Sequence, residues 1–203
     1  MNRNSQSEAR VRPLRERLRA ETVRAILAAA ERVFAEKGTR AAKVEEIAHR
    51  AGVSVGTVYN HFEDRESLLA ALVEERRAEL AARLESAGDE SQPFEAQLRQ
   101  FVGTVFEHFE SNREYLAILL EGDAANVTRP SEAMLELRRR AEALVHRGVA
   151  QKALRRERVE LLPSMLFGAV RASLVHELRH PETLPFGERA DAVVEFFLHG
   201  AGA

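Results

Sequence analysis

The sequence predicts an all-α protein with an N-terminal helix-turn-helix domain and a C-terminal helical domain. Strong helix formers (alanine, leucine, glutamate and arginine) dominate the 203 residues, whereas strand formers in alternation are scarce. Apolar residues instead recur at steps of three and four, which is the spacing of one face of a helix. A hydrophobic fraction of 45% suffices for a packed core, and 31% charged residues indicate a soluble protein.

The chain opens with a polar arm and one long helix. Residues 1–12 are rich in arginine and lack periodicity, so they predict a disordered basic arm. This arm could reach a minor groove, or it could remain a solvated tail. The helix after it ends at Gly38, a residue suited to the left-handed position that follows a helix. Its apolar face consists of Val23, Ile26, Leu27, Ala30, Val33 and Phe34.

Two short helices joined by a tight turn follow. The first carries its apolar residues on one face, and the chain turns at Gly52 and Val53. Ser54 stands where the second helix needs an N-cap, because its hydroxyl can accept from free backbone N–H groups. Val58 and Phe62, four residues apart, anchor that helix inward. This build is that of a helix-turn-helix, whose second helix enters the DNA major groove. The face of the first helix consists of Val44, Ile47, Ala48 and Ala51.

A fourth helix, from Asp64 to about Ser86, is expected to run out of this domain into the rest of the chain. Asp64 is a suitable N-cap, and leucines at helical spacing follow it. Residues 88–93 mark the end of the helix. We expect a DNA-binding domain over residues 13–73 and a second domain over residues 74–203.

The second domain predicts further helices separated by loops at residues 122–130 and 181–187. Pro163 must lie in the first turn of its helix or kink it, because proline cannot donate a backbone hydrogen bond. The apolar stripes that predict these helices span Phe94–Phe109, Tyr115–Leu120, Ser131–Leu154, Leu161–His180 and Glu188–His199.

Composition excludes several classes of protein. The chain has no cysteine, so it forms no disulfide and no thiolate metal site. No apolar run approaches the roughly 20 residues of a membrane span, and the basic N-terminus lacks the apolar core of a signal peptide. We therefore expect a cytoplasmic protein without membrane contact.

Charge is distributed unevenly along the chain. Residues 1–65 hold 13 Lys and Arg against 9 Asp and Glu, whereas residues 66–203 hold 17 against 23. A basic front and an acidic rear suit a DNA-binding module fused to a body that stays away from the phosphates, although chance scatter is the alternative.

Residues 24–73 resemble the tetracycline-repressor (TetR/AcrR) family of bacterial transcriptional regulators. The match is dense and without gaps, and it covers about a quarter of the chain. The resemblance implies a homodimeric regulator, most simply a repressor that a small apolar or amphipathic ligand releases from a palindromic DNA operator. It implies no cofactor and no enzyme activity. The matching residues are Arg24, Ile26, Leu27, Ala29, Ala30, Phe34, Gly38, Ile47, Ala48, Ala51, Gly52, Val53, Ser54, Gly56, Thr57, Val58, Tyr59, His61, Phe62, Glu66, Leu68 and Leu69.

The second short helix carries hydroxyl, phenol, amide and imidazole groups that can hydrogen-bond phosphates and base edges. The resemblance implies that Tyr59 and His61 hold phosphates. The alternative is that Tyr59 is a core aromatic and His61 a plain surface residue. The family often has threonines before the first short helix, but here the segment is Ala41-Ala42-Lys43, so Lys43 is the candidate phosphate contact there. Candidate DNA-binding residues are Lys43, Val44, Ser54, Val55, Gly56, Thr57, Tyr59, Asn60, His61 and Arg65.

A ligand cavity among the rear helices needs apolar walls with a few polar groups. An aromatic stripe at helical spacing is also what a plain core requires, so that alternative stays open. Candidate ligand-binding residues are Phe101, Val105, His108, Phe109, Tyr115, Leu119, Phe167, Arg171 and His176.

The segment from His176 to His180 matches H-E-x-x-H, the pattern of zinc metalloproteases. Pro181 ends the helix at once, and Arg179 places a cation in it. No third histidine follows at the expected spacing, and Glu195 is the main carboxylate in the 23 residues after His180. We therefore interpret the match as chance, with a regulatory or adventitious metal at the two histidines as the alternative.

The resemblance also implies that the last two helices pair across a two-fold axis. Val193, Phe196 and Phe197 are too apolar to be left exposed near a chain end, so we expect them in the dimer interface.

Overall fold

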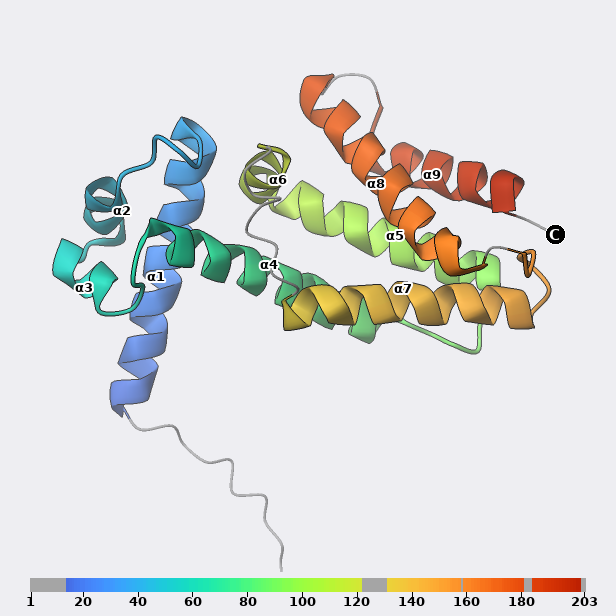
Figure 1. Ribbon diagram of the computed structural model, residues 1–203, viewed down its shortest axis with the longest axis horizontal. Coiled ribbons are helices and arrows are strands. Elements are labelled where there is room, and N and C mark those ends of the chain that lie inside the picture. The colour runs from blue at the N-terminus through green and yellow to red at the C-terminus, as the bar shows by residue number, and fades with distance from the viewer. Residues whose placement is uncertain (1–13, 122–130, 158, 181–183, 202–203) are drawn as a thin grey trace, which may run out of the picture.

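The computed structural model describes residues 14–121, 131–157, 159–180 and 184–201, and within these ranges the regular structure is helical with no strand. Figure 1 shows a small unit of three helices at one end of a longer helical body, with α4 running from the unit into the body. The all-α prediction and the order of the two parts are confirmed. The predicted boundary at residue 73 stays a prediction, because α4 passes through it without a break.

The elements follow the predicted order. They are α1 (Leu14–Lys37), α2 (Val44–Ala51), α3 (Val55–Tyr59), α4 (Arg65–Ala87), α5 (Phe94–Ser111), α6 (Arg113–Leu120), α7 (Glu132–Ala150), the 3-10 turn η2 (Val159–Leu161), α8 (Leu162–Arg179) and α9 (Phe186–Ala201).

Local sequence signals set most of the helix ends. Gly38 and Gly52 adopt φ angles of 81° and 69°, the left-handed region that a side chain disfavours. The Ser54 hydroxyl accepts from the Thr57 backbone N–H at 3.0 Å, which caps α3. Asp64 caps α4 and forms a reciprocal capping box with Ser67.

The observed ends of α7, α8 and α9 can be compared with the predicted ones. The helix α7 stops at Ala150 rather than Leu154, because Lys152 adopts a φ of 59° and turns the chain. The helix α9 begins at Phe186, two residues before the predicted start. Pro163 lies in the first turn of α8, as predicted. The predicted arm (residues 1–12) and the predicted loop at residues 122–130 lie outside the described residues.

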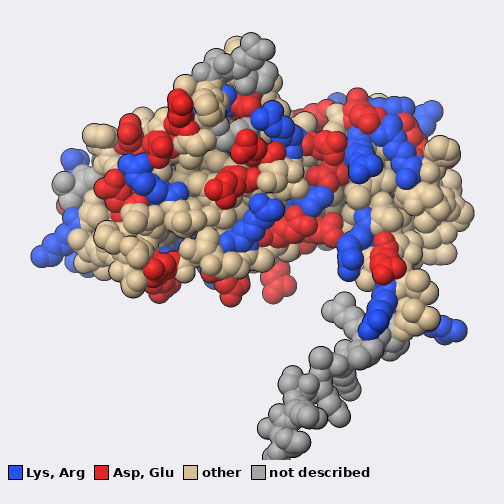
Figure 2. All heavy atoms as spheres, turned by 180° about the vertical axis from the view of Figure 1, so that it is seen from behind, with Lys and Arg blue, Asp and Glu red and all other residues tan. Residues whose placement is uncertain are grey.

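One apolar core runs through both parts of the molecule. In the small unit, α1 packs on α2 and α4 through fully buried side chains such as Phe34, Ile47 and Leu68. In the body, α5 lies against α4, α7 and α9, and α9 also packs on α8. Lys and Arg side chains alternate with Asp and Glu over the face seen in Figure 2, rather than forming separate patches. None of the described helices is both long and apolar enough to cross a membrane.

Candidate DNA-contacting surface and ligand cavity

The helix α3 presents a polar, exposed surface at the end of the small unit. Val58 is fully buried and fixes the helix on the core. The Tyr59 side chain is 50% exposed, and Gly56 and Asn60 are exposed beside it. The interpretation of Tyr59 as a core aromatic is therefore wrong. The phenol and the Asn60 amide are available to a ligand as large as a DNA duplex.

Hydrogen bonds rigidify the start of α3. The Ser54 hydroxyl lies 2.8 Å from the Thr57 hydroxyl, in addition to accepting from the Thr57 N–H. Both side chains are therefore held by each other, and their remaining hydrogen-bonding capacity faces outward. Val55 and His61 are half-buried, so each keeps one edge accessible.

The residues predicted at the start of α2 behave differently from one another. Lys43 is exposed, so its ammonium group is accessible from solvent. The Val44 side chain is 7% exposed and packs in the core. A side-chain contact from Val44 to DNA is therefore ruled out, and its backbone at the first turn of α2 is what can approach a phosphate.

Arg65 is already engaged at the start of α4. Its guanidinium donates to the Arg40 carbonyl oxygen at 2.5 Å and to the Glu66 carboxylate at 2.6 Å. The same pairing lowers the pKa of Glu66, because a carboxylate that accepts from a guanidinium is stabilised in its charged form. Arg65 thus ties α4 to the loop between α1 and α2, and a phosphate would have to compete with Glu66 for it.

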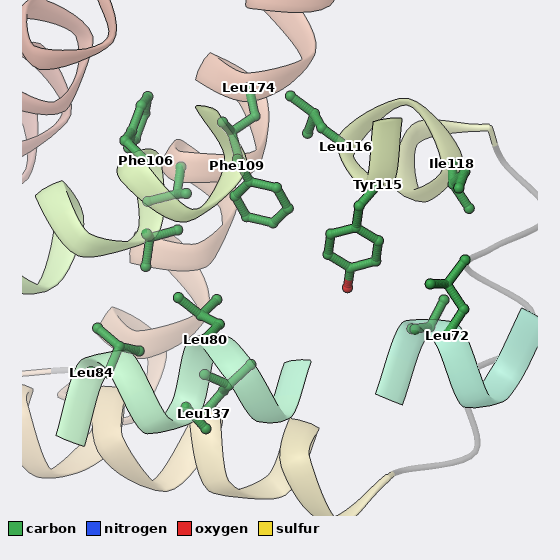
Figure 3. Close-up of a cluster of buried hydrophobic side chains, with 14 of the residues drawn as sticks. Leu72, Leu80, Leu84, Phe106, Phe109, Tyr115, Leu116, Ile118, Leu137 and Leu174 are labelled. Atoms are coloured by element: carbon green, nitrogen blue, oxygen red, sulfur yellow. The ribbon is translucent and has the colours of Figure 1, made fainter. Parts of the chain in front are cut away.

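The body contains a partly open apolar cavity of about 360 Å³ between α4, α5, α6, α7 and α8. Predicted ligand residues that line it are Phe101, Val105, Phe109, Tyr115, Leu119, Phe167 and Arg171. In Figure 3 the Phe109 and Tyr115 rings lie side by side above the α4 leucines Leu80 and Leu84. Their centroids are 5.8 Å apart and their planes are nearly parallel, so the two rings form one continuous apolar surface.

Two predicted polar ligand residues do not line this cavity. His108 is fully buried on another side of α5, and neither ring nitrogen has a hydrogen-bond partner. Burial lowers the pKa of His108 to about 4. His176 is exposed on the surface of α8. Both were expected to orient a ligand, and helical spacing alone could not show that each side chain points away from the cavity.

Arginine supplies the charge at the cavity instead. Among the residues that the structure describes, four arginines line it and no aspartate or glutamate does. Arg171 was predicted from the sequence to bind the ligand, but Arg76, Arg77 and Arg138 were not. The available signal was two adjacent cations in α4, one helical turn before Leu80. The phenol of Tyr115 lies beside Arg77, and burial raises the pKa of Tyr115 to about 12, so the phenol stays protonated and can donate.

Two polar links join the cavity wall to the small unit. The Arg76 guanidinium makes a bidentate pair with Glu31 of α1, which is 5% exposed, and also binds Glu79. The Glu121 carboxylate, at the end of α6, accepts from the backbone N–H of Thr39 at 2.8 Å. A shift of α4 or α6 would therefore displace α1.

The H-E-x-x-H segment does not have the geometry of a metalloprotease site. Glu177, which would be the general base, is 3% exposed and forms an ion pair with the equally buried Arg189 of α9. His176 and His180 are exposed, with ring centroids 4.8 Å apart. Among the described residues no group of three or more His, Asp or Glu side chains could hold a metal ion. Glu177 therefore joins α8 to α9.

The apolar residues of α9 divide between core and surface. Val193 and Phe197 are buried within the protomer, so the expectation that both lie in a dimer interface is wrong. Their spacing of four places them on the side of α9 that packs on α5 and α8. Phe196 is 72% exposed, and Met165 of α8 and Leu161 of the preceding turn η2 are also exposed.

Comparison with known proteins supports the resemblance. The model for bacterial regulatory proteins of the tetR family matches residues 26–72. Over 54 residues the chain is 46% identical to the HTH-type transcriptional repressor BepR of Brucella suis biovar 1 (strain 1330). That match covers 27% of this chain and 26% of the relative, so the chain aligns with about a quarter of the relative's length.

Solved structures extend the likeness to the whole fold. A tetR-family transcription regulator from Shewanella sp. PV-4 matches with a TM-score of 0.74 at 20% identity, covering 90% of this chain and 98% of that one. The regulator FadR from Bacillus subtilis, solved in complex with stearoyl-CoA, matches with a TM-score of 0.77 at 20% identity, covering 87% and 98%. At these identities the likeness concerns the fold, which both parts of this chain share with these structures.

Proposed function

We propose that this chain, which carries the DNA-binding domain of the tetR family of bacterial regulatory proteins over residues 26–72, is a ligand-released transcriptional repressor. The observation that carries the proposal is the double role of α4. Its N-terminal half supplies Leu68 and Leu72 to the apolar core that also holds Val58 of α3, and its C-terminal half supplies Leu80 and Leu84 to the cavity wall. One rigid helix thus connects the surface that would contact DNA with the site that would bind an effector.

On DNA, α3 would enter the major groove. Tyr59 and His61 would donate to phosphates, whereas Val55, Gly56, Thr57 and Asn60 would lie nearest the base edges. Exposure of Tyr59, Gly56 and Asn60 supports these roles. Lys43 and the first backbone N–H groups of α2 would bind another phosphate, because the positive end of a helix dipole favours an anion.

The effector would be an amphipathic molecule with an anionic group. Apolar walls favour a hydrocarbon portion, and the four arginines, with no carboxylate beside them in the described part of the lining, favour a negative charge. Arg76 is already paired with Glu31, so Arg77, Arg138 and Arg171 are the cations that would bind the anion. The stearoyl-CoA in the FadR structure has this chemistry: an acyl chain and a phosphate-bearing head.

Release would follow from the links between cavity and small unit. A ligand that binds between α4 and α6 would shift Arg76 relative to Glu31 and Glu121 relative to Thr39. Each change repositions α1 and α4, and with them α3. The ligand weakens DNA binding only by the difference in its affinity for the two states, typically about 1–3 kcal/mol.

The functional unit would be a homodimer formed by α8 and α9. Phe196 of α9 and Met165 of α8 are exposed apolar side chains, as is Leu161 just before α8, and an exposed apolar surface marks an interface. A two-fold dimer presents two copies of α3, so half-sites should lie about one helical turn, roughly 34 Å, apart or somewhat further.

Selection of binding fragments from genomic DNA tests the proposal. The wild-type protein should enrich one near-palindromic sequence, and its affinity should fall steeply with salt as Lys and Arg release counterions. The Tyr59→Ala/His61→Ala double variant should lose enrichment while keeping its melting temperature. A matched control, Glu142→Ala/His146→Ala on the exposed side of α7, should keep it. Equal enrichment by the Tyr59/His61 variant would contradict the proposal.

A further inference from the structure

A second cavity of about 670 Å³, open to solvent along much of its lining, lies next to the apolar cavity. It is bounded by the end of α4, the start of α5 and the second half of α7. Leu84 and Phe101 line both cavities, so that one cavity lies on each side of this pair of side chains. Leu84 is 6% exposed and fixed in the core, whereas Phe101 is half-buried and has room to be displaced. These two side chains form a partition between the two spaces.

The cavities lie end to end along the same three helices. On α4, the first cavity is lined from Arg76 to Leu84 and the second from Leu84 to Gly88. On α7, lining by Met134–Arg138 gives way to lining by Arg140–Arg147. On α5, which contributes in the opposite sequence direction, Phe101 lines both cavities, Ala96, Gln97, Gln100 and Thr104 line only the second, and Val105 and Phe109 line only the first. The two cavities therefore lie along one line, and the partition of Leu84 and Phe101 separates them.

The two cavities differ in the charges of their lining residues. The second cavity has two arginines, but Arg147 is paired with Glu90 at 3.0 Å and Arg140 with Glu85 at 3.3 Å. Asp89 adds a further negative charge to its lining. An anion is therefore not attracted there, and the anionic group of a ligand stays at the arginines of the first cavity. Arg77 and Leu84 are seven residues apart, about 10 Å along the helix, so a chain held at Arg77 extends toward the partition.

We propose that Phe101 sets the maximal length of the apolar chain that this protein accepts, by closing the ligand cavity against the second cavity. The inference rests on the proposed function, because it assumes an amphipathic ligand whose charge is held at the arginines. Chains short enough to end before Phe101 gain affinity with every added methylene. Longer chains must displace the ring into the second cavity and lose that gain.

Affinity measured against chain length tests the role of Phe101. Isothermal titration with the straight-chain carboxylates from octanoate to palmitate, each below its aggregation concentration, should show a rise of about fourfold per methylene in the wild-type protein and then a plateau or fall. In Phe101→Ala the rise should continue for at least two further methylenes, because Ala87, Ala96 and Ala143 offer apolar surface beyond the partition. Phe101→Leu should lie between the two.

Phe167→Ala is the matched control. Phe167 is also a half-buried phenylalanine, but it lines the first cavity and not the second. Its removal should change affinity for chains of all lengths without moving the optimum. Adding Ala143→Phe to Phe101→Ala should abolish the extension, because the new ring refills the second cavity beside the partition.

The matching primary alcohols separate this inference from the proposed function. If alcohols bind with the Phe101-dependent length limit but carboxylates do not bind, the partition stands and the anionic ligand is wrong. If carboxylates bind but Phe101→Ala and Phe167→Ala give the same optimum as the wild type, the partition is wrong and the ligand class stands. Binding of neither series to the wild-type protein overturns both.

Discussion

The Glu121 carboxylate accepts a 2.8 Å hydrogen bond from the backbone N–H of Thr39, across the junction between the body and the small unit. Thr39 is 5% exposed, so water has little access to replace the bond. Gly38, the preceding residue, comes so close that an added Cβ would lie 3.1 Å from a Glu121 oxygen. The end of α6, a wall of the ligand cavity, is thereby fixed to the end of α1.

Glu121→Ala should uncouple ligand binding from DNA binding. The variant loses the acceptor that joins α6 to α1, so the same ligand should weaken operator binding several-fold less than it does in the wild-type protein. Glu121→Gln keeps an acceptor oxygen and should keep most of the coupling. Fluorescence anisotropy with the selected operator, with and without saturating ligand, measures this. Glu114→Ala, which removes an exposed carboxylate at the other end of α6, is the control. Unchanged coupling in Glu121→Ala would show that this bond transmits nothing.

Phe196→Asp should produce a folded monomer. The Phe196 side chain is 72% exposed in the protomer, so a charge costs little there unless a partner subunit covers it. Phe197→Asp should instead unfold the protein, because Phe197 is 4% exposed and packs in the core. Analytical ultracentrifugation and circular dichroism distinguish the two outcomes. A dimer formed by Phe196→Asp as tightly as by the wild type would place the interface elsewhere.

Phe196 and Phe197 differ in a way that the periodicity of the sequence could not predict. Periodicity predicted that α9 is a helix and that it buries apolar residues. It could not decide which of two adjacent phenylalanines faces the protomer, because α9 packs on α5, nearly a hundred residues away in the sequence. Local signals were sufficient where the interaction is local: Ser54, Asp64 and Gly52 cap or turn the chain through bonds within four residues.

His108 should make the folded state sensitive to mild acid. Burial lowers its pKa to about 4 from about 6.5, so the folded state resists a proton that the unfolded chain accepts. Its contribution to stability is therefore complete above pH 6.5 and is lost as the pH falls toward 4. Phe109 and Tyr115 contact the imidazole edge to face, so a phenylalanine ring suits the same site.

His108→Phe should remove this contribution to acid sensitivity, which amounts to about 3 kcal/mol at most. Urea unfolding at a series of pH values measures the effect, and His146→Phe, at an exposed histidine of α7, is the control. Parallel pH profiles for the wild type and His108→Phe would mean that His108 titrates normally.

Two glycines in the body should respond oppositely to alanine. A Cβ on Gly148 of α7 would lie 2.7 Å from the Phe94 ring and from Leu154, so Gly148→Ala should destabilise the protein by about 1–3 kcal/mol. Gly103, inside α5, has nothing within 4 Å of an added Cβ. Gly103→Ala should therefore stabilise by about 0.5–1 kcal/mol through higher helix propensity. Thermal unfolding of the two variants gives the comparison, and a destabilised Gly103→Ala would contradict this packing.

The candidate ligand cavity was predictable in part. Seven of the nine residues predicted to bind the ligand line the cavity, because aromatic and leucine residues on facing helices converge in an antiparallel body. The polar residues were harder to place. His108 and His176 share their helices with lining residues but point elsewhere, whereas Arg76 and Arg77 line the cavity from the helix that the sequence predicted to connect the two domains. Such assignments depend on how the helices rotate about their axes, which periodicity does not fix.

Reciprocal titration is the most direct test of the central claim, that one helix couples the cavity to the DNA-contacting surface. The ligand that binds most tightly in the carboxylate series is titrated into the protein alone and into the protein saturated with its selected operator. Linkage requires that the operator weaken ligand binding by the same factor by which the ligand weakens operator binding, and we expect about 5- to 150-fold. A ligand affinity that is unchanged by saturating operator would contradict the account.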